Sequence, residues 1–240
     1  MKFSLVIPCY NEEKNLTDLV SKCQQLREKI DCEIIFVNNG STDSTQSVLE
    51  TLTQPHQSMR IVHVLVNQGY GYGILSGLEA ARSDILAWCH ADLQTDPADA
   101  ISAMTLFGNT EAPETLFVKG LRKKRSLSDT AFTVGMSIFE SLLFGQKLWD
   151  INAQPTMFHR KFYADLKDAP HDFSIDLFFY ACAKKQGLTV KRVPVFFPER
   201  LHGHSSWNLD FGSKVKFIKR TIKFSFELKS RFRGERFADH

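Results

Sequence analysis

A short apolar run ends abruptly in polar residues near position 90. Ile85–Cys89 is typical of a buried strand, and His90-Ala91-Asp92-Leu93-Gln94 follows it, with Pro97 at a favoured first position of a helix. Asp92 and Gln94 therefore bring oxygen atoms to the carboxyl end of a strand. In an open α/β sheet this edge binds ligands, and hard divalent cations prefer oxygen ligands. The stretch predicts a cation site at a sheet edge.

An isolated aspartate after a strand more often caps a helix or lies in a solvated turn. Asp92 and Asp96, taken alone, fit that description. However, polar loops of similar character follow every strand predicted in the first ninety residues: Phe3–Ile7, Glu33–Val37, Ile61–Val66 and Ile85–Cys89. Helical patterns separate these strands, which predicts right-handed crossovers and a parallel sheet whose loops converge on one edge. We therefore favour a binding site over four unrelated turns.

The remaining chain predicts a looser arrangement of elements. We expect a helix from Pro97 to about Phe107, a strand at Leu116–Lys119, and helices at 131–144 and 175–185. Residues 189–197 alternate like a strand and include proline, which favours an edge position. Gly69, Gly71 and Gly73 precede a helix, but their spacing and their place after the third strand do not match a dinucleotide-binding loop.

Composition restricts the class of protein. The chain has 240 residues, 43% hydrophobic and 24% charged, which predicts one large globular domain. Its five cysteines lack a C-x-x-C pair, so we expect neither a disulfide framework nor a zinc site. We therefore expect a reducing compartment. No leader-like segment is recognised, and no apolar stretch reaches the about 18 residues that span a bilayer. We expect a cytoplasmic protein.

Three ordered motifs resemble a known family. Val6-Ile7-Pro8-Cys9-Tyr10-Asn11-Glu12, Phe36-Val37-Asn38-Asn39-Gly40-Ser41-Thr42-Asp43 and the stretch from His90 to Gln94 resemble, in order and spacing, the inverting family 2 glycosyltransferases with a GT-A fold. They look most similar to the dolichyl- and polyprenyl-phosphate sugar synthases, which carry D-A-D-L-Q at the last motif. The resemblance covers residues 3–205. It implies a Rossmann-like, mostly parallel α/β sheet flanked by helices, which we assign to residues 1–212.

The resemblance also implies a donor site. Pro8, Tyr10, Asn11 and Glu12 match the loop that holds the base and ribose of the nucleotide sugar. Asn39 matches a residue that hydrogen-bonds the base, Asp43 one that shapes the same turn, and Asp92 one that contacts the donor. Asn38 and Asn39 replace the two acidic residues of the family's D-D-G-S pattern. An amide offers one donor and one acceptor, which suits uracil better than guanine, so we expect a UDP-sugar.

The implied metal site departs from the family pattern. His90 stands where the family has the first aspartate, so the expected ligands are Asp92, Gln94 and His90. The resemblance implies a divalent cation, Mn²⁺ or Mg²⁺, and imidazole is better tolerated by Mn²⁺. An equal alternative is that His90 hydrogen-bonds only the ribose or a water molecule.

Residues further along match the acceptor side of the family's site. Arg122 and Arg125 match cations that contact the diphosphate or the acceptor phosphate, and Arg200 begins a segment similar to the family's R-x-x-G-x-S. The lysine that usually follows that segment is Ser206 here. Asp150 matches an aspartate that we expect to act as the acceptor-side base. With a phosphate acceptor, which is already ionised near neutral pH, Asp150 would orient and not deprotonate.

The last residues form a basic extension, 213–240. Residues 213–236 carry nine Lys/Arg and two Glu, a charge of +7, so the remaining residues carry 3 minus 7, or −4. Apolar residues recur at helical spacing, while Lys216, Lys219, Arg220 and Lys223 occupy the other face. This pattern predicts a helix that lies on an anionic membrane surface. The alternatives are a helix docked on the domain or a homo-oligomer contact, and nucleic acid is not an expected partner.

The sequence therefore predicts a metal-dependent inverting glycosyltransferase. It would move a sugar from a nucleotide-sugar donor to a polyprenyl phosphate at the cytosolic face of a membrane, as a peripheral enzyme with or without a membrane partner protein. One alternative is transfer to a hydroxyl group of a glycan or glycolipid, favoured by Ser206 and the altered segment Asn152-Ala153-Gln154-Pro155. Another is a non-catalytic nucleotide-sugar binding protein, favoured by His90 and the two asparagines.

Overall fold

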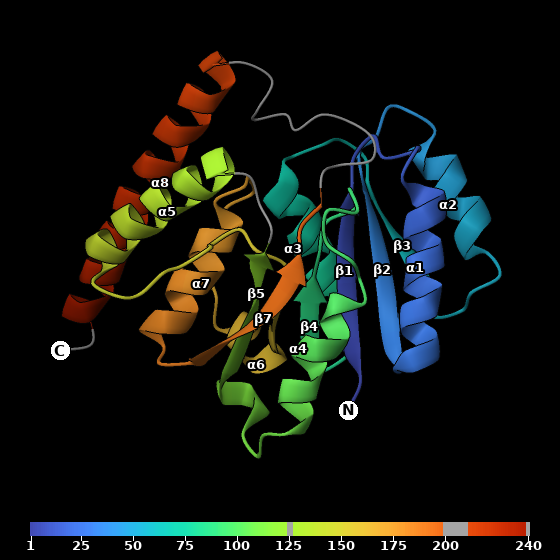
Figure 1. Ribbon diagram of the computed structural model, residues 1–240, viewed down its shortest axis with the longest axis horizontal. Coiled ribbons are helices and arrows are strands. Elements are labelled where there is room, and N and C mark those ends of the chain that lie inside the picture. Colours follow the sequence, from blue (N-terminus) through green and yellow to red (C-terminus); the bar gives the residue numbers. More distant parts are fainter. Residues whose placement is uncertain (124–126, 199–210, 239–240) are drawn as a thin grey trace.

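One seven-stranded sheet forms the centre of the molecule (Figure 1). The structure, a computed structural model, describes residues 1–123, 127–198 and 211–238. The strands lie in the order β3-β2-β1-β4-β6-β5-β7. Their bounds are β1 (Phe3–Cys9), β2 (Cys32–Asn39), β3 (Met59–Val64), β4 (Ile85–Trp88), β5 (Leu116–Lys123), β6 (Thr156–His159) and β7 (Thr189–Phe196).

The first four strands are parallel, as the sequence predicts. Val6 of β1 lies opposite Ile35 of β2 and Trp88 of β4. Every residue of β1 and β2 is buried, because helices cover both faces of this half of the sheet. That burial explains why these strands read as continuous apolar runs without polar alternation.

Strand β6 is the exception in direction, and the sequence did not reveal it. It lies between β4 and β5 and runs antiparallel to both, with Thr156 opposite Trp88 on one side and Lys119 on the other. The strand is only four residues long and follows Pro155, so it has too little pattern to be recognised. Because β6 runs backwards, the loop that precedes it reaches the same sheet edge at which β4 and β5 end. Strand β7 lies at the edge of the sheet, as predicted.

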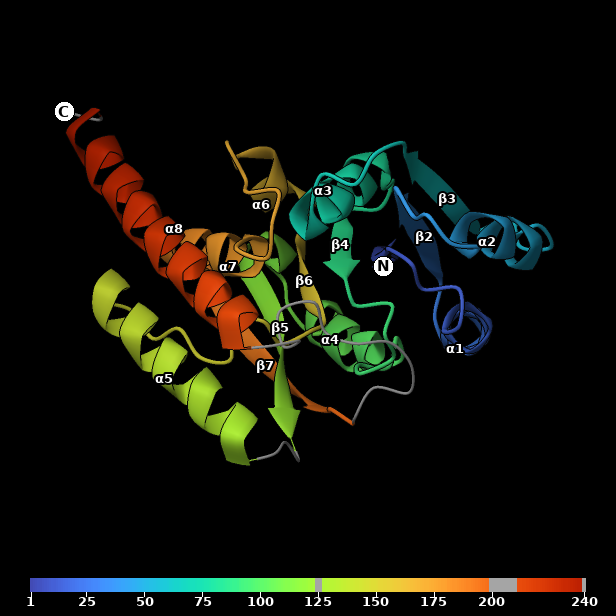
Figure 2. The ribbon, with the colours of Figure 1, turned by 90° about the horizontal axis from the view of Figure 1, so that it is seen from above.

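Helices cover the two faces of the sheet (Figure 2). Apolar side chains of α1 (Leu16–Lys29), α2 (Thr45–Thr53) and α4 (Asp99–Gly108) share one core with Leu5 and Ile7. The other core contains Val6 and side chains of α3 (Tyr70–Ala80), α6 (Arg160–Ala164) and α7 (Ile175–Lys185). A short 3₁₀ helix, η1 (Pro113–Thr115), precedes β5. Adjacent residues of β1 thus point into different cores, as the pleat requires.

Two long helices, α5 (Leu127–Phe144) and α8 (Phe211–Ala238), lie side by side outside the sheet (Figures 1 and 2). Their rings meet where Phe139 contacts Phe226, with centroids 6.1 Å apart, and Leu228 of α8 is 1% exposed. The C-terminal segment is thus helical and docked on the domain, which is one of the alternatives drawn from the sequence. Within the described ranges, no helix is both long enough and apolar enough to cross a membrane.

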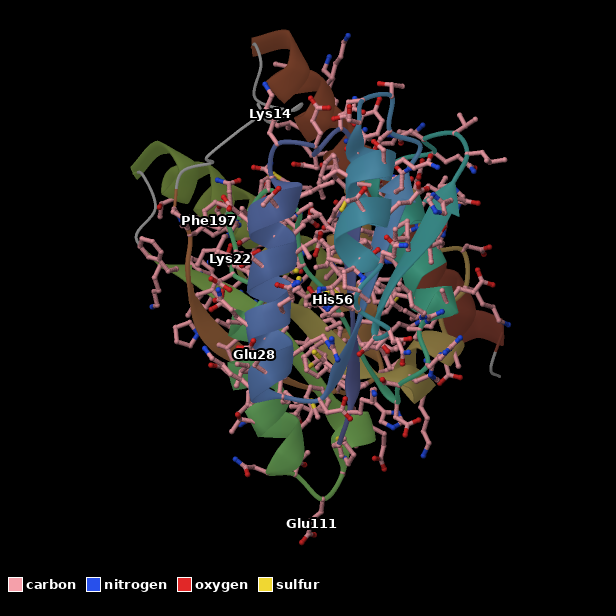
Figure 3. The ribbon with its side chains drawn as sticks, turned by 90° about the vertical axis from the view of Figure 1, so that its right-hand side faces the viewer. Lys14, Lys22, Glu28, His56, Glu111 and Phe197 are labelled. Carbon is pink, nitrogen blue, oxygen red and sulfur yellow. The ribbon has the colours of Figure 1, made fainter. Side chains whose placement is uncertain are left out.

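The carboxyl ends and the amino ends of the parallel strands lie at opposite ends of the molecule (Figure 3). Lys14, which follows β1, lies at the end where the parallel strands finish. Glu111, between α4 and η1, lies at the far end. The loops that carry the candidate site residues therefore gather at the Lys14 end.

Candidate active site

The loops after β1 and β2 interlock. The backbone N–H of Thr42 donates to Asn11 Oδ1 at 2.8 Å, and the backbone N–H of Asn11 donates to Ser41 Oγ at 3.1 Å. The N–H of Glu12 donates to Thr45 Oγ1 at 2.8 Å, and the N–H of the same threonine, the first residue of α2, donates to Asp43 Oδ1 at 3.0 Å. The structure thus brings together two loops that lie thirty residues apart in the sequence.

Asn39 lies at the floor of this loop pair. Its Nδ2 donates to the carbonyl oxygen of Gly69 at 3.0 Å, which fixes the amide orientation. Its Oδ1 is buried and has no hydrogen-bond partner among the described residues. Pro8 is buried beside it, whereas the ring of Tyr10 is 46% exposed. Asn39 Oδ1 is therefore an unpaired acceptor within the described residues, and the N–H group of a base is the kind of donor that would pair with it.

The loop after β4 places Asp92 and Gln94 together. Asp92 is 5% exposed, and its Oδ1 accepts from the backbone N–H of Gln94 at 3.1 Å. The side-chain Nε2 of Gln94 donates to the carbonyl oxygen of Pro198 at 3.2 Å. Because the amide nitrogen is used in this way, Oε1 is the atom of Gln94 that would serve as a metal ligand.

His90 is held by an aromatic stack that the sequence did not reveal. The His90 ring lies over the Tyr70 ring, with centroids 5.3 Å apart and planes 20° apart. The Phe173 ring also stacks on Tyr70, with centroids 4.7 Å apart and planes 15° apart. Three distant segments therefore meet in one stack. Tyr70 lies in the glycine-rich stretch 67–73, which does not match a dinucleotide-binding loop, and no local pattern singles out Phe173.

The residue types at the end of β4 are ones that could hold a cation shared with a diphosphate. Among the described residues, no group of three or more His, Cys, Asp or Glu side chains is arranged around a common metal position. A cation that binds through substrate phosphates commonly uses only one or two protein carboxylates. Asp92 would supply a carboxylate, Gln94 an amide oxygen and His90 an imidazole nitrogen. This mixed oxygen and nitrogen set suits Mn²⁺.

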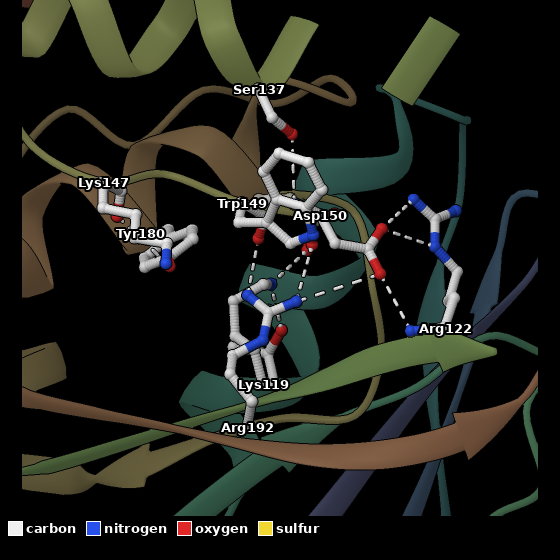
Figure 4. A network of polar contacts seen from close by, with 10 residues as sticks. Lys119, Arg122, Ser137, Lys147, Trp149, Asp150, Tyr180 and Arg192 are labelled. Carbon is white, nitrogen blue, oxygen red and sulfur yellow. Dashed lines mark hydrogen bonds and ion pairs between the residues drawn. The ribbon is translucent and has the colours of Figure 1, made fainter. Parts of the chain in front are cut away.

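Asp150 lies at the centre of a network of cations (Figure 4). Its carboxylate accepts from Arg122 three times: from Nε at 2.7 Å, from the backbone N–H at 2.8 Å, and from Nη2. Nη2 of Arg192 lies 3.9 Å from Oδ2, and the backbone N–H of Asp150 donates to Ser137 Oγ at 3.1 Å. Asp150 is 3% exposed. The predicted base and the predicted phosphate cation are therefore partners of each other.

These contacts control the charge of Asp150. Burial would raise the pKa of its carboxyl group, but the charge of Arg122, the hydrogen bonds from Arg122 and the charge of Arg192 together lower the pKa below the ordinary value of 3.8. The carboxylate is thus ionised at neutral pH and has little affinity for a further proton. Its geometry suits orientation better than proton removal.

A second buried ion pair supports the floor of the site. Nζ of Lys119 lies 3.3 Å from Asp176 Oδ1, and both side chains are almost fully buried. Burial lowers the pKa of Lys119 to about 8, although Asp176 opposes that shift. Thr156 and Gln154 complete the network, at 2.7 Å from Lys119 Nζ and 2.8 Å from Asp176 Oδ1. Neither Lys119 nor Asp176 belongs to a recognisable motif, so no sequence pattern predicts this pair.

Left-handed backbone is concentrated in the candidate loops. Asn11, Leu93 and Asp150 have φ angles of 55°, 60° and 47°. Such angles are uncommon for residues other than glycine and are most often retained at functional sites. One other non-glycine residue among those described, Asp168, shares this conformation. Arg125, Arg200 and the segment 201–206 lie outside the described residues.

Comparison with known proteins places this arrangement in a family. The family described as "Glycosyl transferase family 2" matches residues 4–164. The chain belongs to glycosyl transferase family 2. The matched region contains the loops after β1, β2 and β4 and also Arg122 and Asp150.

Curated relatives of this family 2 chain have related names. It is 35% identical over 102 residues to an undecaprenyl-phosphate 4-deoxy-4-formamido-L-arabinose transferase of Pseudomonas fluorescens, covering 40% of this chain and 29% of the relative. It is 33% identical over 104 residues to the protein of the same name in Proteus mirabilis, covering 41% and 31%. The chain thus matches less than a third of the length of these relatives.

Solved structures share the fold of this family 2 chain. Glucosyl-3-phosphoglycerate synthase of Mycobacterium tuberculosis, in complex with Mn²⁺, UDP and glucosyl-3-phosphoglycerate, has a TM-score of 0.74 and 17% identity, covering 95% of this chain and 79% of that chain. The same synthase with Mn²⁺ and UDP-glucose has a TM-score of 0.72 and 19% identity, covering 93% and 78%. The predicted GT-A fold is confirmed.

We expect the Arg122–Asp150 pair to stabilise the fold. Because the pKa of Asp150 is lower in the folded chain than in the unfolded chain, the pair stabilises the fold above pH 3.8, and this contribution is lost as pH falls through the folded value. Arg122→Met would leave a buried carboxylate without its main partner. We expect the free energy of unfolding, measured with urea at pH 7, to fall by about 3–5 kcal/mol.

The loss of unfolding free energy caused by Arg122→Met should become smaller near pH 4, where Asp150 of the variant takes up a proton. Lys2→Met is the matched control, because Lys2 pairs with Asp31 at an exposed position and should contribute no more than about 1 kcal/mol. If Arg122→Met lowers the free energy of unfolding at pH 7 by as little as Lys2→Met does, the proposed stabilising role of the Arg122–Asp150 pair is contradicted.

Proposed function

We propose that this chain transfers a sugar from a UDP-sugar to a polyprenyl phosphate, with inversion at C1. The observation that carries the choice of acceptor is the environment of Asp150. A hydroxyl acceptor needs a base that can take a proton, whereas this carboxylate is held by Arg122 and its pKa is lowered. A phosphate monoester is largely ionised at neutral pH, so it needs a cation to hold it and no base.

The donor side is supported by Asn39 and the loop after β4. The buried, unpaired Oδ1 of Asn39 is suited to accept from the N3–H of uracil. Asp92, with Gln94 and His90, would hold a divalent cation, and one solved neighbour that shares this fold, glucosyl-3-phosphoglycerate synthase, is a complex that contains Mn²⁺ and UDP. When bound, such a cation supplies positive charge to the diphosphate leaving group.

The reaction is a single displacement. An oxygen of the acceptor phosphate attacks C1 of the sugar on the face opposite the diphosphate, the bond from C1 to the diphosphate oxygen breaks, and UDP departs. Arg122, with Asp150 fixing its guanidinium plane, would hold the acceptor phosphate near C1. The names of the curated relatives support this acceptor, because they describe undecaprenyl-phosphate sugar transferases.

Product analysis tests this proposal. We expect that purified protein, incubated with Mn²⁺, undecaprenyl phosphate in vesicles and a panel of UDP-sugars labelled in the sugar, converts one of them into a chloroform-soluble product. A sugar attached through a phosphodiester should be released by mild acid. Asp92→Ala should lower the rate at least about 100-fold, since it removes the only carboxylate of the proposed cation site.

Asp96→Asn is the matched control, because Asp96 lies in the same loop but pairs with Lys22 and accepts from the backbone N–H of Ala98, just before α4. It should keep most of the activity. A label that appears only on a glycan or glycolipid hydroxyl would support the alternative acceptor. Binding of UDP-sugars without turnover of any of them would support a non-catalytic binding protein.

The acceptor also requires contact with a membrane, and α5 and α8 offer a surface for it. Ile138 and Leu142 of α5 are 51% and 78% exposed, and Phe226 of α8 is 55% exposed. Lys219, Arg220 and Lys223 are exposed on α8. We propose that this helix pair lies on the cytosolic leaflet, with the apolar side chains inserted and the cations near anionic headgroups.

Vesicle sedimentation tests the membrane surface. The double change Leu142→Ser with Phe226→Ser should weaken binding to vesicles that contain anionic phospholipid by at least about tenfold, because two large apolar side chains no longer leave water. Leu65→Ser is the control, since Leu65 is 95% exposed in the loop after β3. Equal binding by the double variant and the wild type would contradict the proposal.

A further inference from the structure

A small cavity lies beside Arg122, between α5, α8, the loop at 150–152 and the start of α7. Its volume of about 50 Å³ corresponds to about three to five water molecules. Met136, Phe173 and Leu177 form apolar parts of the wall, while Asn152 and Glu140 form polar parts. The cavity is too small for a whole sugar ring, but it matches the size of one substituent on a ring.

Glu140 is the residue of this cavity that lacks a full set of partners. Its side chain comes from α5, and the residue is 0% exposed. Oε1 lies 2.7 Å from Oγ of Ser225 on α8. Oε2 is buried and has no hydrogen-bond partner among the described residues. A buried unpaired carboxyl oxygen is costly, so a donor group that reaches this part of the cavity wall would gain a hydrogen bond there.

The hydrogen bonds around Ser225 define what Oε2 can do. Ser225 Oγ lies 2.7 Å from Glu140 Oε1 and 2.8 Å from the carbonyl oxygen of Thr221, yet a serine hydroxyl has a single proton. Both contacts are satisfied if Glu140 holds a proton on Oε1 and donates it to Ser225, which donates to Thr221. Burial raises the pKa of Glu140 to about 7, in agreement with this arrangement. Oε2 is then a carbonyl oxygen, and it is a hydrogen-bond acceptor whether or not the carboxyl is ionised.

The cavity adjoins the candidate active site on two sides. Arg122, which forms part of its wall, is the partner of Asp150. Phe173, on another wall, stacks on Tyr70 at 4.7 Å, and Tyr70 stacks on His90 at 5.3 Å. Two ring-to-ring steps therefore separate the cavity from the loop that would hold the diphosphate. The sugar of a donor is attached directly to that diphosphate.

We propose that this cavity is a specificity subsite for the transferred sugar, in which an O–H or N–H group of one ring substituent donates to Glu140 Oε2. The inference rests on the proposed use of a UDP-sugar. Hydroxyl, hydroxymethyl and acylamino substituents have both the size and the donor that the cavity requires. A deoxy sugar at the same position would leave Oε2 unpaired and would bind more weakly.

Calorimetric titration of the 240-residue chain tests the subsite. With Mn²⁺ present, UDP is compared with UDP-glucose, UDP-galactose and UDP-N-acetylglucosamine. At least one of these sugars should bind the wild type about tenfold more tightly than UDP. Glu140→Leu should remove that advantage and leave the Kd for UDP unchanged, which also shows that the variant is folded. Glu140→Gln should keep the advantage within about threefold, since its amide oxygen can replace Oε2 and its NH₂ group can donate to Ser225.

Ser225→Ala separates binding from helix docking. It removes the contact between α8 and Glu140 but leaves Oε2 in place, so the advantage of the UDP-sugar should persist while the melting temperature falls. The inference is overturned if Glu140→Leu keeps the advantage, if Ser225→Ala removes it as fully as Glu140→Leu does, or if no UDP-sugar binds the wild type more tightly than UDP. A protein that binds neither UDP nor any UDP-sugar would instead overturn the proposed function.

Discussion

The ion pair between Arg122 and Asp150 joins the parts of the molecule that have to meet at the acceptor side. Arg122 comes from the end of β5, and Asp150 comes from the loop that leads to β6. Arg192 of β7 donates to the backbone oxygens of Trp149 and Asp150, while Ser137 of α5 accepts from the backbone of Asp150. Because these charges are buried, each depends on the other, and loss of one partner leaves a charge with no solvent to stabilise it.

The direction of β6 makes this meeting possible. In a purely parallel sheet, the loop before a strand lies at the amino edge, far from the ligand-binding loops. Here the reversed strand starts at Thr156, opposite the last residue of β4, so the residues before it lie at the carboxyl edge. Close packing fixes that loop, since a Cβ atom on Gly120 would lie 1.9 Å from the carbonyl oxygen of Gln154. The parallel half of the sheet thus positions the proposed donor site, and the reversed strand positions the proposed acceptor side.

Local patterns were sufficient to predict the first hundred residues of the fold. The continuous apolar runs of β1, β2 and β4 and the polar loops after them follow directly from burial on both faces of a parallel sheet. The short strand β6 was missed because four residues carry no period. Glu140 was missed because it lies within an apolar helical pattern, and only the packing of α8 against α5 shows that it is buried.

The residues of the candidate site also fall into two groups: those that the sequence reveals and those that only the structure reveals. Asn39, Asp92 and Asp150 were recognisable from motifs, whereas Lys119, Arg192 and Tyr70 acquire their roles from tertiary contacts with Asp176, Asp150 and His90. A sequence motif specifies which side chains are present at a sheet edge. It does not specify which of them are already paired. Pairing with Arg122 makes Asp150 a weak base, whereas Asn39 Oδ1 and Glu140 Oε2 have no hydrogen-bond partner within the described structure.

The most direct test of a nucleotide diphosphate site at the end of β4 is calorimetric titration of UDP with Mn²⁺ and with a chelator. The account predicts that Mn²⁺ tightens UDP binding at least about tenfold in the wild type, and that Asp92→Ala removes this difference, because Asp92 is the carboxylate of the proposed site. Equal affinity for UDP with and without Mn²⁺ in the wild type, or a metal effect that persists in Asp92→Ala, would contradict it.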